Sequence, residues 1–348
     1  MKNQRVRLGG SRVVFPILFN SLIISTLFAI LFSFPFFFFG CSDPESANVN
    51  HHQDSLSTGI QGEVKPLRVV ATTGMIADLA KNIGGDQVEV KALMGVGVDP
   101  HLYKARAGDI NRLSSANLIL YNGLHLEAGM AGVLERLSDQ HPQRVICVTD
   151  LVERSKLTAP PEFAGAYDPH VWFDVSLWMS VAESIRDALI QRRPSEERIF
   201  QQKAEQYLHR LTELDVYVKE KASLIPENRR VLVTAHDAFG YFGRAYGFEV
   251  KGLQGISTAA EAGTADVRQL AQFIAERRIP AIFVESSVPT QSIEAVQAAV
   301  KARGFEVKIG GELFSDAMGN PETDEGTYVG MVRHNIDTIL QGLAGGSS

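Results

Sequence analysis

A long uninterrupted helical pattern in the middle of the chain most constrains what this sequence can fold into. Residues 195–224 lie between Pro194 and Pro226, and no Pro or Gly interrupts them. Apolar side chains recur along the segment at helical spacing: Ile199, Leu208, Leu211, Leu214 and Val218. A helix of about thirty residues is roughly 45 Å long, which exceeds the width of one small lobe. The pattern therefore predicts a rigid strut between two other parts of the chain.

Short β-rich runs that alternate with amphipathic segments flank this helix on both sides. The runs predict strands at 67–72, 87–93, 117–121 and 144–148 before it, and at 230–235, 248–252, 281–285 and 305–309 after it. Alternation of this kind is typical of parallel α/β folds. We therefore predict two (βα)4-type lobes with parallel sheets, over 67–193 and 227–348, joined by a linking helix within 194–226.

The first forty residues differ in composition from the rest of the chain. They contain four basic residues, all before residue 13, and no acid. The rest of this segment, the run 13–40, is uncharged. This pattern is typical of a secretory signal, although the run is also long enough to be an uncleaved membrane anchor. The Gly40-Cys41 pair predicts a lipoprotein processing site with lipidation at Cys41. The polar segment 41–66 predicts a flexible tether. Both alternatives place the body in the periplasm or at the cell surface.

Charge and cysteine content exclude several classes of function. Beyond residue 40 the chain has 30 Lys and Arg against 40 Asp and Glu, a net charge of −10. Such an acidic body does not suit nucleic acid, whose binding requires clustered positive charge. Only Cys41 and Cys147 are present, so neither a disulfide framework nor a thiolate metal cluster is available. Apolar neighbours predict that Cys147 is a small core residue.

Three of the nine histidines share a context that suggests a ligand site. His101 and His170 each close an Asp-Pro-His sequence, and His236 directly follows the predicted strand 230–235. Asp316 lies just beyond the predicted strand 305–309. Ligands of open α/β sheets collect outside the carboxyl ends of strands, so two candidates from each lobe would face a shared cleft. Spacing alone also allows each of these residues to have a separate structural role and no shared site. His125, which also follows a strand, is a candidate for orienting such a site from outside.

Several longer segments, taken as an ordered set, resemble the metal-specific solute-binding proteins of bacterial ABC transporters for zinc and manganese. They are VDPHLYKARAGDI, DPHVWFDVSLW, TAHDAFGYFGRAYGFEVKGLQGIST, IFVESSVP, GGELFSDAMG and EGTYVGMVRHNIDTI. The resemblance covers about 67–343 and implies two small α/β lobes joined by one long helix.

The resemblance also implies a ligand set and partners. Matched residue by residue, the metal ligands of the family fall on His101, His170, His236 and Asp316. Carboxylate partners for the ligand histidines are expected, with Glu261 and Glu285 as candidates. The implied partner is a membrane permease with a cytoplasmic ATPase. We expect a monomer that has no ATP site of its own.

The identity of the metal is only partly constrained. Three imidazoles and one carboxylate suit tetrahedral zinc, whereas manganese prefers more oxygen ligands. Zinc-specific relatives often carry a His-rich loop that 138–167 lacks, and manganese-specific relatives often have Glu where this chain has His236. We expect zinc or manganese as the cargo. Zinc should bind more tightly than manganese, and iron is a less favoured cargo than either.

Two other functions are considered. A zinc hydrolase keeps one coordination position open for water, whereas four protein ligands would fill the coordination sphere, and no H-E-x-x-H sequence is present. We therefore expect no enzyme activity. Family members have also been assigned a role as adhesins. No part of this sequence identifies a receptor surface, so adhesion would be a secondary role.

Overall fold

The computed structural model describes residues 65–163 and 165–344. The predicted signal or anchor, Cys41 and nearly all of the tether lie outside the described residues. Within the described part of the chain, no helix is long and apolar enough to cross a membrane.

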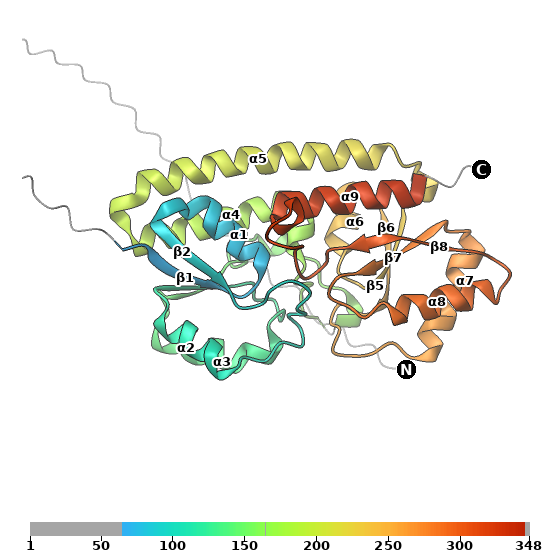
Figure 1. Cartoon of the computed structure of the whole chain (residues 1–348), viewed down its shortest axis with the longest axis horizontal. Helices are drawn as coiled ribbons and strands as arrows, with labels where there is room; N and C mark the ends of the chain where they lie inside the picture. Colours follow the sequence, from blue (N-terminus) through green and yellow to red (C-terminus); the bar gives the residue numbers. More distant parts are fainter. Residues whose placement is uncertain (1–64, 164, 345–348) are drawn as a thin grey trace, which may run out of the picture. The chain divides into compact units, whose positions relative to one another are not determined.

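The N-terminal lobe is a four-stranded parallel sheet covered by helices on both faces. Its strands are β1 (Leu67–Ala71), β2 (Val88–Ala92), β3 (Leu118–Tyr121) and β4 (Val145–Cys147), in the order β2-β1-β3-β4. Its helices are α1 (Gly74–Gly84), α2 (Ala107–Ser115), α3 (Ala131–Gln140) and α4 (Val175–Arg192). Figure 1 shows α1 and α4 on one face of the sheet and α2 and α3 on the other. The carboxyl ends of the strands point toward the C-terminal lobe.

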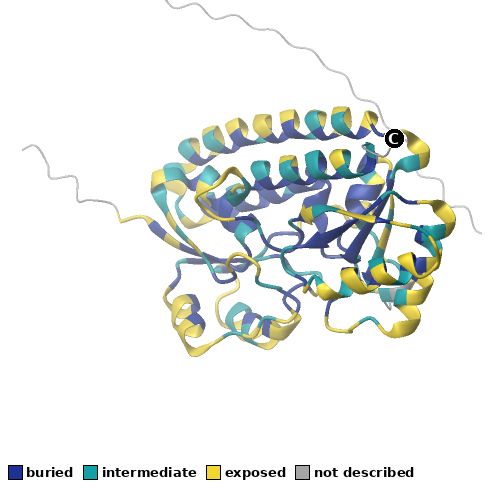
Figure 2. Ribbon diagram, turned by 45° about the vertical axis from the view of Figure 1, so that its right-hand side comes forward, coloured by how far each residue is buried: buried dark blue, intermediate teal, exposed yellow. Residues whose placement is uncertain are grey.

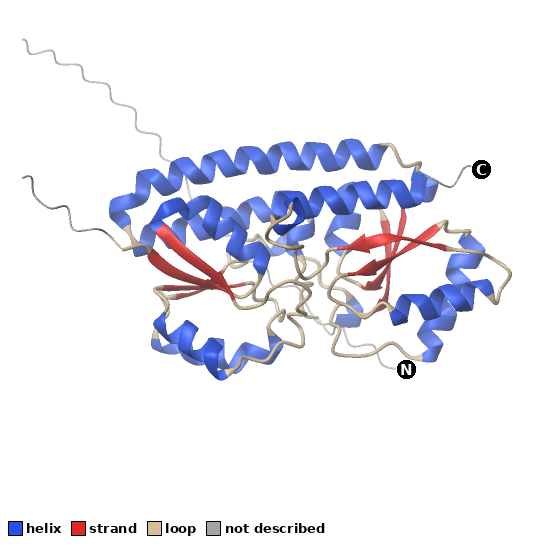
Figure 3. Ribbon diagram, in the orientation of Figure 1, coloured by secondary structure: helices blue, strands red, loops and turns tan. Residues whose placement is uncertain are grey.

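The C-terminal lobe repeats this plan with two parallel strand pairs. Its strands are β5 (Val231–His236), β6 (Glu249–Gln254), β7 (Ala281–Glu285) and β8 (Lys308–Leu313), with β5 paired to β6 and β7 to β8. Its helices are α6 (Gly240–Tyr246), α7 (Thr264–Arg277), α8 (Gln291–Lys301) and α9 (Tyr328–Ala344). β5 lies beside β7, and α7 and α8 lie on the opposite side of the strands from α9 (Figure 3).

The last strand, β8, begins later in the sequence than predicted. The segment 305–309 was expected to be extended, whereas β8 begins at Lys308 and runs through two glycines to Leu313. Gly304 adopts a left-handed backbone with φ +80° and turns the chain after α8, which delays the strand. A side chain at Gly310 would lie within 2.7 Å of the Phe283 ring, so the strand passes close to β7 at a position where a larger residue does not fit.

The predicted strut is present as α5 (Glu197–Ser223), a helix of 27 residues that is about 40 Å long. It packs on α1, α4 and α9. Figure 2 shows the buried side of α5 facing the rest of the molecule and the exposed side facing away. Ile199 and Leu208 of the predicted apolar stripe are only half-buried. Leu211, Leu214 and Val218 are buried as predicted, and the buried stripe also contains Phe200, Ala204, Tyr207 and Ala222.

The largest hydrophobic core is shared by both lobes and by α5. It extends from Ile76 and Trp178 in the N-terminal lobe through Leu214 on α5 to Phe239 and Ile336 in the C-terminal lobe. Two smaller cores lie one in each lobe. Pulling the lobes apart would expose part of the shared core to water, which costs roughly 25 cal/mol for each Å² of apolar surface. The shared core therefore opposes wide separation of the lobes.

A buried carboxylate ties three helices together next to this core. Asp78 on α1 accepts hydrogen bonds from the hydroxyl of Tyr207 on α5 (2.9 Å) and from the backbone N–H of Tyr328 at the start of α9 (3.3 Å). Burial raises the pKa of Asp78, and both hydrogen bonds oppose that rise.

We predict that Tyr207→Phe lowers the free energy of unfolding by about 1–2 kcal/mol, because it leaves an Asp78 oxygen buried without this donor. Tyr217→Phe is the matched control, since Tyr217 lies half-buried on the same helix and donates to Asp337 (2.8 Å) near solvent. Its effect should stay within about 0.5 kcal/mol. Urea unfolding measures both, and equal effects would contradict the role given to Asp78.

Candidate metal centre

Four side chains from four separate segments meet between the two lobes. His101 lies in the loop after β2, and His170 directly precedes the short 3₁₀ helix Val171–Phe173. His236 is the last residue of β5, and Asp316 lies in the loop after β8. All four are buried, and their ligand atoms lie within 4.8 Å of one another. These residues are called the metal centre below.

The distances between these atoms suit one small ion. Nε2 of His101 lies 3.3 Å from Nε2 of His170 and 3.6 Å from Oδ2 of Asp316. Nε2 of His170 lies 3.4 Å from Asp316 Oδ1, and Nε2 of His236 lies 3.3 Å from Asp316 Oδ2. Ligands about 2.0 Å from a zinc ion in a tetrahedron lie roughly 3.3 Å from each other. These four separations are therefore close to those of a tetrahedral site.

Several of these atoms have no hydrogen-bond partner. Nε2 of His236 and both carboxylate oxygens of Asp316 are buried without a hydrogen bond to any described residue. A buried carboxylate without donors is unfavourable unless a cation compensates it. The chemistry of the centre is thus that of a cation site.

Two of the three imidazoles are oriented by carboxylates behind them. Asp168 Oδ1 lies 2.7 Å from Nδ1 of His170 and also accepts the backbone N–H of His170 (3.0 Å). Glu285 Oε2 lies 2.6 Å from Nδ1 of His236, and its Oε1 accepts the backbone N–H of His236 (2.8 Å). A carboxylate at Nδ1 fixes the ring and turns Nε2 toward the centre.

His101 is supported differently although it closes the same tripeptide. Asp99 accepts the backbone N–H of His101 (2.8 Å), as Asp168 does for His170. Its other oxygen accepts the hydroxyl of Thr258 from the C-terminal lobe (2.5 Å). The His101 ring consequently has no carboxylate at Nδ1 among the described residues.

The electrostatics separate the three histidines. Burial lowers the pKa of His101 to about 3, despite the nearby Asp316. Burial acts in the same direction on His170, but Asp168 and Asp316 together outweigh it and raise its pKa to about 9. Glu285 and Asp316 likewise overcome burial and raise the pKa of His236. The pKa of Asp316 is lowered, because His236 and His170 outweigh its burial.

Comparison with known proteins assigns the chain to a family. The family model described as "Zinc-uptake complex component A periplasmic" matches residues 69–342. The chain belongs to this family. The resemblance to zinc and manganese solute-binding proteins that the motifs indicated is therefore confirmed.

Curated relatives include proteins named for zinc and for manganese. The chain is 55% identical over 280 residues to the zinc-binding protein TroA of Treponema pallidum, covering 80% of this chain and 89% of TroA. It is 48% identical over 277 residues to the manganese-binding lipoprotein MntA of Bacillus subtilis, covering 80% of this chain and 90% of MntA.

Solved structures of the family share the fold. The structure of the periplasmic zinc-binding protein TroA from Treponema pallidum matches with a TM-score of 0.78 and 54% identity, covering 80% of this chain and 99% of that one. The Fe(III)-bound YtgA from Chlamydia trachomatis matches with a TM-score of 0.72 and 28% identity, covering 80% and 98%.

Of the two expected carboxylate partners, only Glu285 lies beside a ligand histidine. Glu261 is exposed and lines a different cavity of about 370 Å³, which is also lined by Asp99 and Thr258. Asp168 occupies the position at His170 that an additional partner was expected to fill. The signal for Asp168 was present in the sequence, because it opens the Asp-Pro-His that His170 closes.

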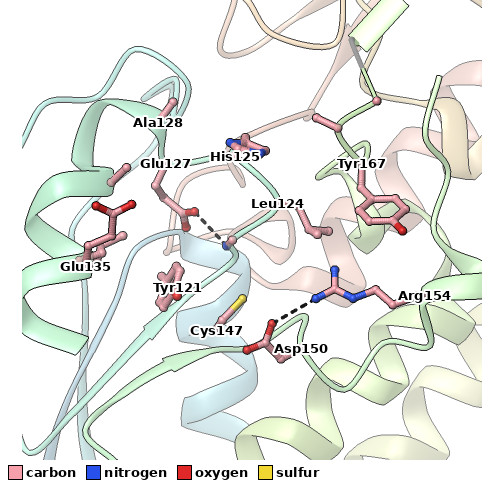
Figure 4. A pocket seen from close by; sticks show the side chains of 15 residues that line it. Tyr121, Leu124, His125, Glu127, Ala128, Glu135, Cys147, Asp150, Arg154 and Tyr167 are labelled. Carbon is pink, nitrogen blue, oxygen red and sulfur yellow. Dashed lines mark hydrogen bonds and ion pairs between the residues drawn. The ribbon is translucent and has the colours of Figure 1, made fainter. Parts of the chain in front are cut away.

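His125 lies away from the metal centre, on the edge of a cavity of about 530 Å³ in the N-terminal lobe. Figure 4 shows it with Tyr121, Glu127 and Cys147 around this cavity. His125 is exposed and has a left-handed backbone with φ +69°. The structure gives it no contact with the four clustered residues, so the orienting role expected for it lacks a geometric basis.

Cys147 differs from its prediction as a core residue. It is half-buried and lines the same cavity, and its thiol donates to the backbone carbonyl of Asn122 (3.3 Å). Burial raises its pKa to about 11. Asn122 was not anticipated from the sequence, although its side-chain amide donates to the carbonyl of Pro169 (3.1 Å), the residue before His170.

Proposed function

We propose that this protein captures a divalent transition metal, zinc or manganese, outside the cytoplasm and delivers it to an ABC-type permease for import. The observation that carries the proposal is the buried convergence of three imidazole Nε2 atoms on a carboxylate without donors. The relatives named for zinc and manganese binding support the choice of cargo. The permease with its cytoplasmic ATPase is the partner, and the protein acts as a monomer.

The proposed ligands are His101 and His170 from the N-terminal lobe and His236 and Asp316 from the C-terminal lobe. We assign the lobes to 67–193 and 227–348 and the linking helix to 194–226. Asp316 can bind through one oxygen, which gives four-coordination, or through both, which gives five-coordination and suits manganese better. The body is held at the membrane through lipidated Cys41 or an uncleaved N-terminal helix.

A capture role fits the centre better than catalysis. A catalytic zinc needs a coordination position open to water and a base beside it. The carboxylates directly behind the centre, Asp168 and Glu285, are engaged with His170 and His236. All four proposed ligands are buried. We therefore propose no enzyme activity, and a role in adhesion is not part of the proposal.

Replacement of His101 and Asp316 together by Ala should abolish binding of one metal ion per chain, because one ligand is lost from each lobe. Elemental analysis after dialysis, with chelator competition for affinity, measures the outcome. His209→Ala is the control, since this exposed histidine on α5 pairs only with Glu213 (3.6 Å). One-to-one binding retained by the double variant would refute the ligand assignment.

Zinc should bind more tightly than manganese in vitro. Three imidazole nitrogens favour zinc, and zinc exceeds manganese in intrinsic affinity for such ligands. A competition titration with both ions at equal concentration should leave zinc on the protein. Displacement of zinc by manganese under these conditions would reverse the ranking.

Metal binding should release about two protons per ion near pH 7. The raised pKa values mean that His170 (about 9) and His236 carry protons there, and the metal must displace both. The apparent affinity should therefore fall as pH decreases from 8 to 6, by about a hundredfold per unit for two protons. Calorimetry in buffers of different ionisation enthalpy counts the protons. An affinity that is constant over this range would contradict the prediction.

A further inference from the structure

We infer that Trp172 is a positioning residue that fixes the metal ligand Asp316 through a hydrogen bond between the two lobes. The inference rests on the proposed function, because it concerns the affinity of the same centre. Trp172 does not itself contact the cation site with a ligand atom. It acts on the backbone that carries Asp316.

Asp316 differs from two of its neighbours in the metal centre in how it is supported. His170 and His236 are each fixed by a carboxylate at Nδ1. The Asp316 oxygens, in contrast, face the three imidazole Nε2 atoms at 3.3–3.6 Å, and no described residue outside the centre donates a hydrogen bond to them. The position of this carboxylate therefore depends on the backbone around residue 316.

Trp172 bonds to that backbone from the opposite lobe. Its indole Nε1 donates to the carbonyl of Ser315 at 3.0 Å, directly before Asp316. Both Trp172 and Ser315 are buried, so water does not compete for this bond. The hydroxyl of Ser315 lies 2.9 Å from that of Ser287, which holds the same residue from a second side.

The indole is itself fixed on its other sides. Its ring packs edge-on against the ring of His170, with centroids 5.2 Å apart and planes at 69°. The backbone carbonyl of Trp172 accepts the hydroxyl of Tyr328 at 2.6 Å. Tyr328 in turn donates its backbone N–H to Asp78, which also accepts the hydroxyl of Tyr207 on α5. A continuous hydrogen-bonded path thus runs from the strut to the residue before Asp316.

This arrangement has one consequence for each lobe. In the N-terminal lobe, the same indole packs on His170 and limits the tilt of its ring. In the C-terminal lobe, it sets where the Asp316 carboxylate lies relative to the imidazoles. Loss of the N–H frees the 315–316 backbone from the N-terminal lobe, so the bound ion should dissociate faster while the ligands themselves remain.

The chain offers a matched pair of variants. Trp172→Phe removes the N–H and keeps an aromatic ring. Trp178→Phe makes the same chemical change at an equally buried site, where the indole nitrogen has no hydrogen-bond partner among the described residues and the ring stacks on Tyr328. Both variants lose similar apolar volume, so their difference reports the contacts that the Trp172 indole makes with Ser315 and His170.

The readout is the affinity for Zn²⁺ by competition with a chromophoric chelator, together with the dissociation rate. Trp172→Phe should bind about tenfold more weakly and release the ion correspondingly faster, the effect of losing one buried hydrogen bond. Trp178→Phe should bind like the unchanged protein. Urea unfolding of both metal-free variants establishes that each is folded under the conditions of the titration. Equal affinities of the two variants would overturn the inference.

A second measurement does not depend on whether Trp172→Phe folds. The chain has two tryptophans, so Trp178→Phe leaves Trp172 as the only indole. Its N–H proton should exchange slowly with solvent by NMR and more slowly still with Zn²⁺ bound. Rapid exchange that Zn²⁺ does not change would overturn the inference. Failure of both the unchanged protein and Trp178→Phe to bind Zn²⁺ would instead refute the proposed function.

Discussion

The buried carboxylate of Asp316 facing three imidazoles is the interaction on which the rest of the site depends. Such a group is tolerated only if positive charge stays close to it. The raised pKa values of His170 and His236 mean that Asp316 favours the protonated imidazoles when no cation is bound. A bound divalent ion would displace such protons, so it takes over their role of compensating the carboxylate.

The position of this centre between lobes has a mechanical consequence. Two of the proposed ligands come from each lobe, yet the largest core and the helix α5 are common to both lobes. Asp78 and Tyr328 add polar contacts across the same helices. A wide opening would break this packing and is therefore unfavourable. The shared core and α5 thus hold the lobes together and also fix the distances between the donor atoms.

Much of this arrangement follows from sequence patterns that are local. Periodicity predicted α5, and the convergence of parallel strand ends, together with the family resemblance, predicted that His101, His170, His236 and Asp316 would meet. Contacts between distant segments were not accessible in this way. Trp172 and Ser315 are 143 residues apart, and no local pattern marks their hydrogen bond. Glu261 was named as a candidate carboxylate partner, whereas its exposure depends on how the loop before α7 packs.

The two Asp-Pro-His sequences show where such local inference ends. In both, the aspartate accepts the backbone N–H of the histidine two residues later, since that bond is a property of the tripeptide itself. The ring partner differs: Asp168 Oδ1 also lies beside Nδ1 of its histidine, whereas Asp99 bonds through its second oxygen to Thr258 of the other lobe. Identical motifs therefore fix the backbone equally and the imidazoles unequally. A motif can identify candidate ligands. The tertiary neighbours of each ligand determine how strongly its side chain is held in position.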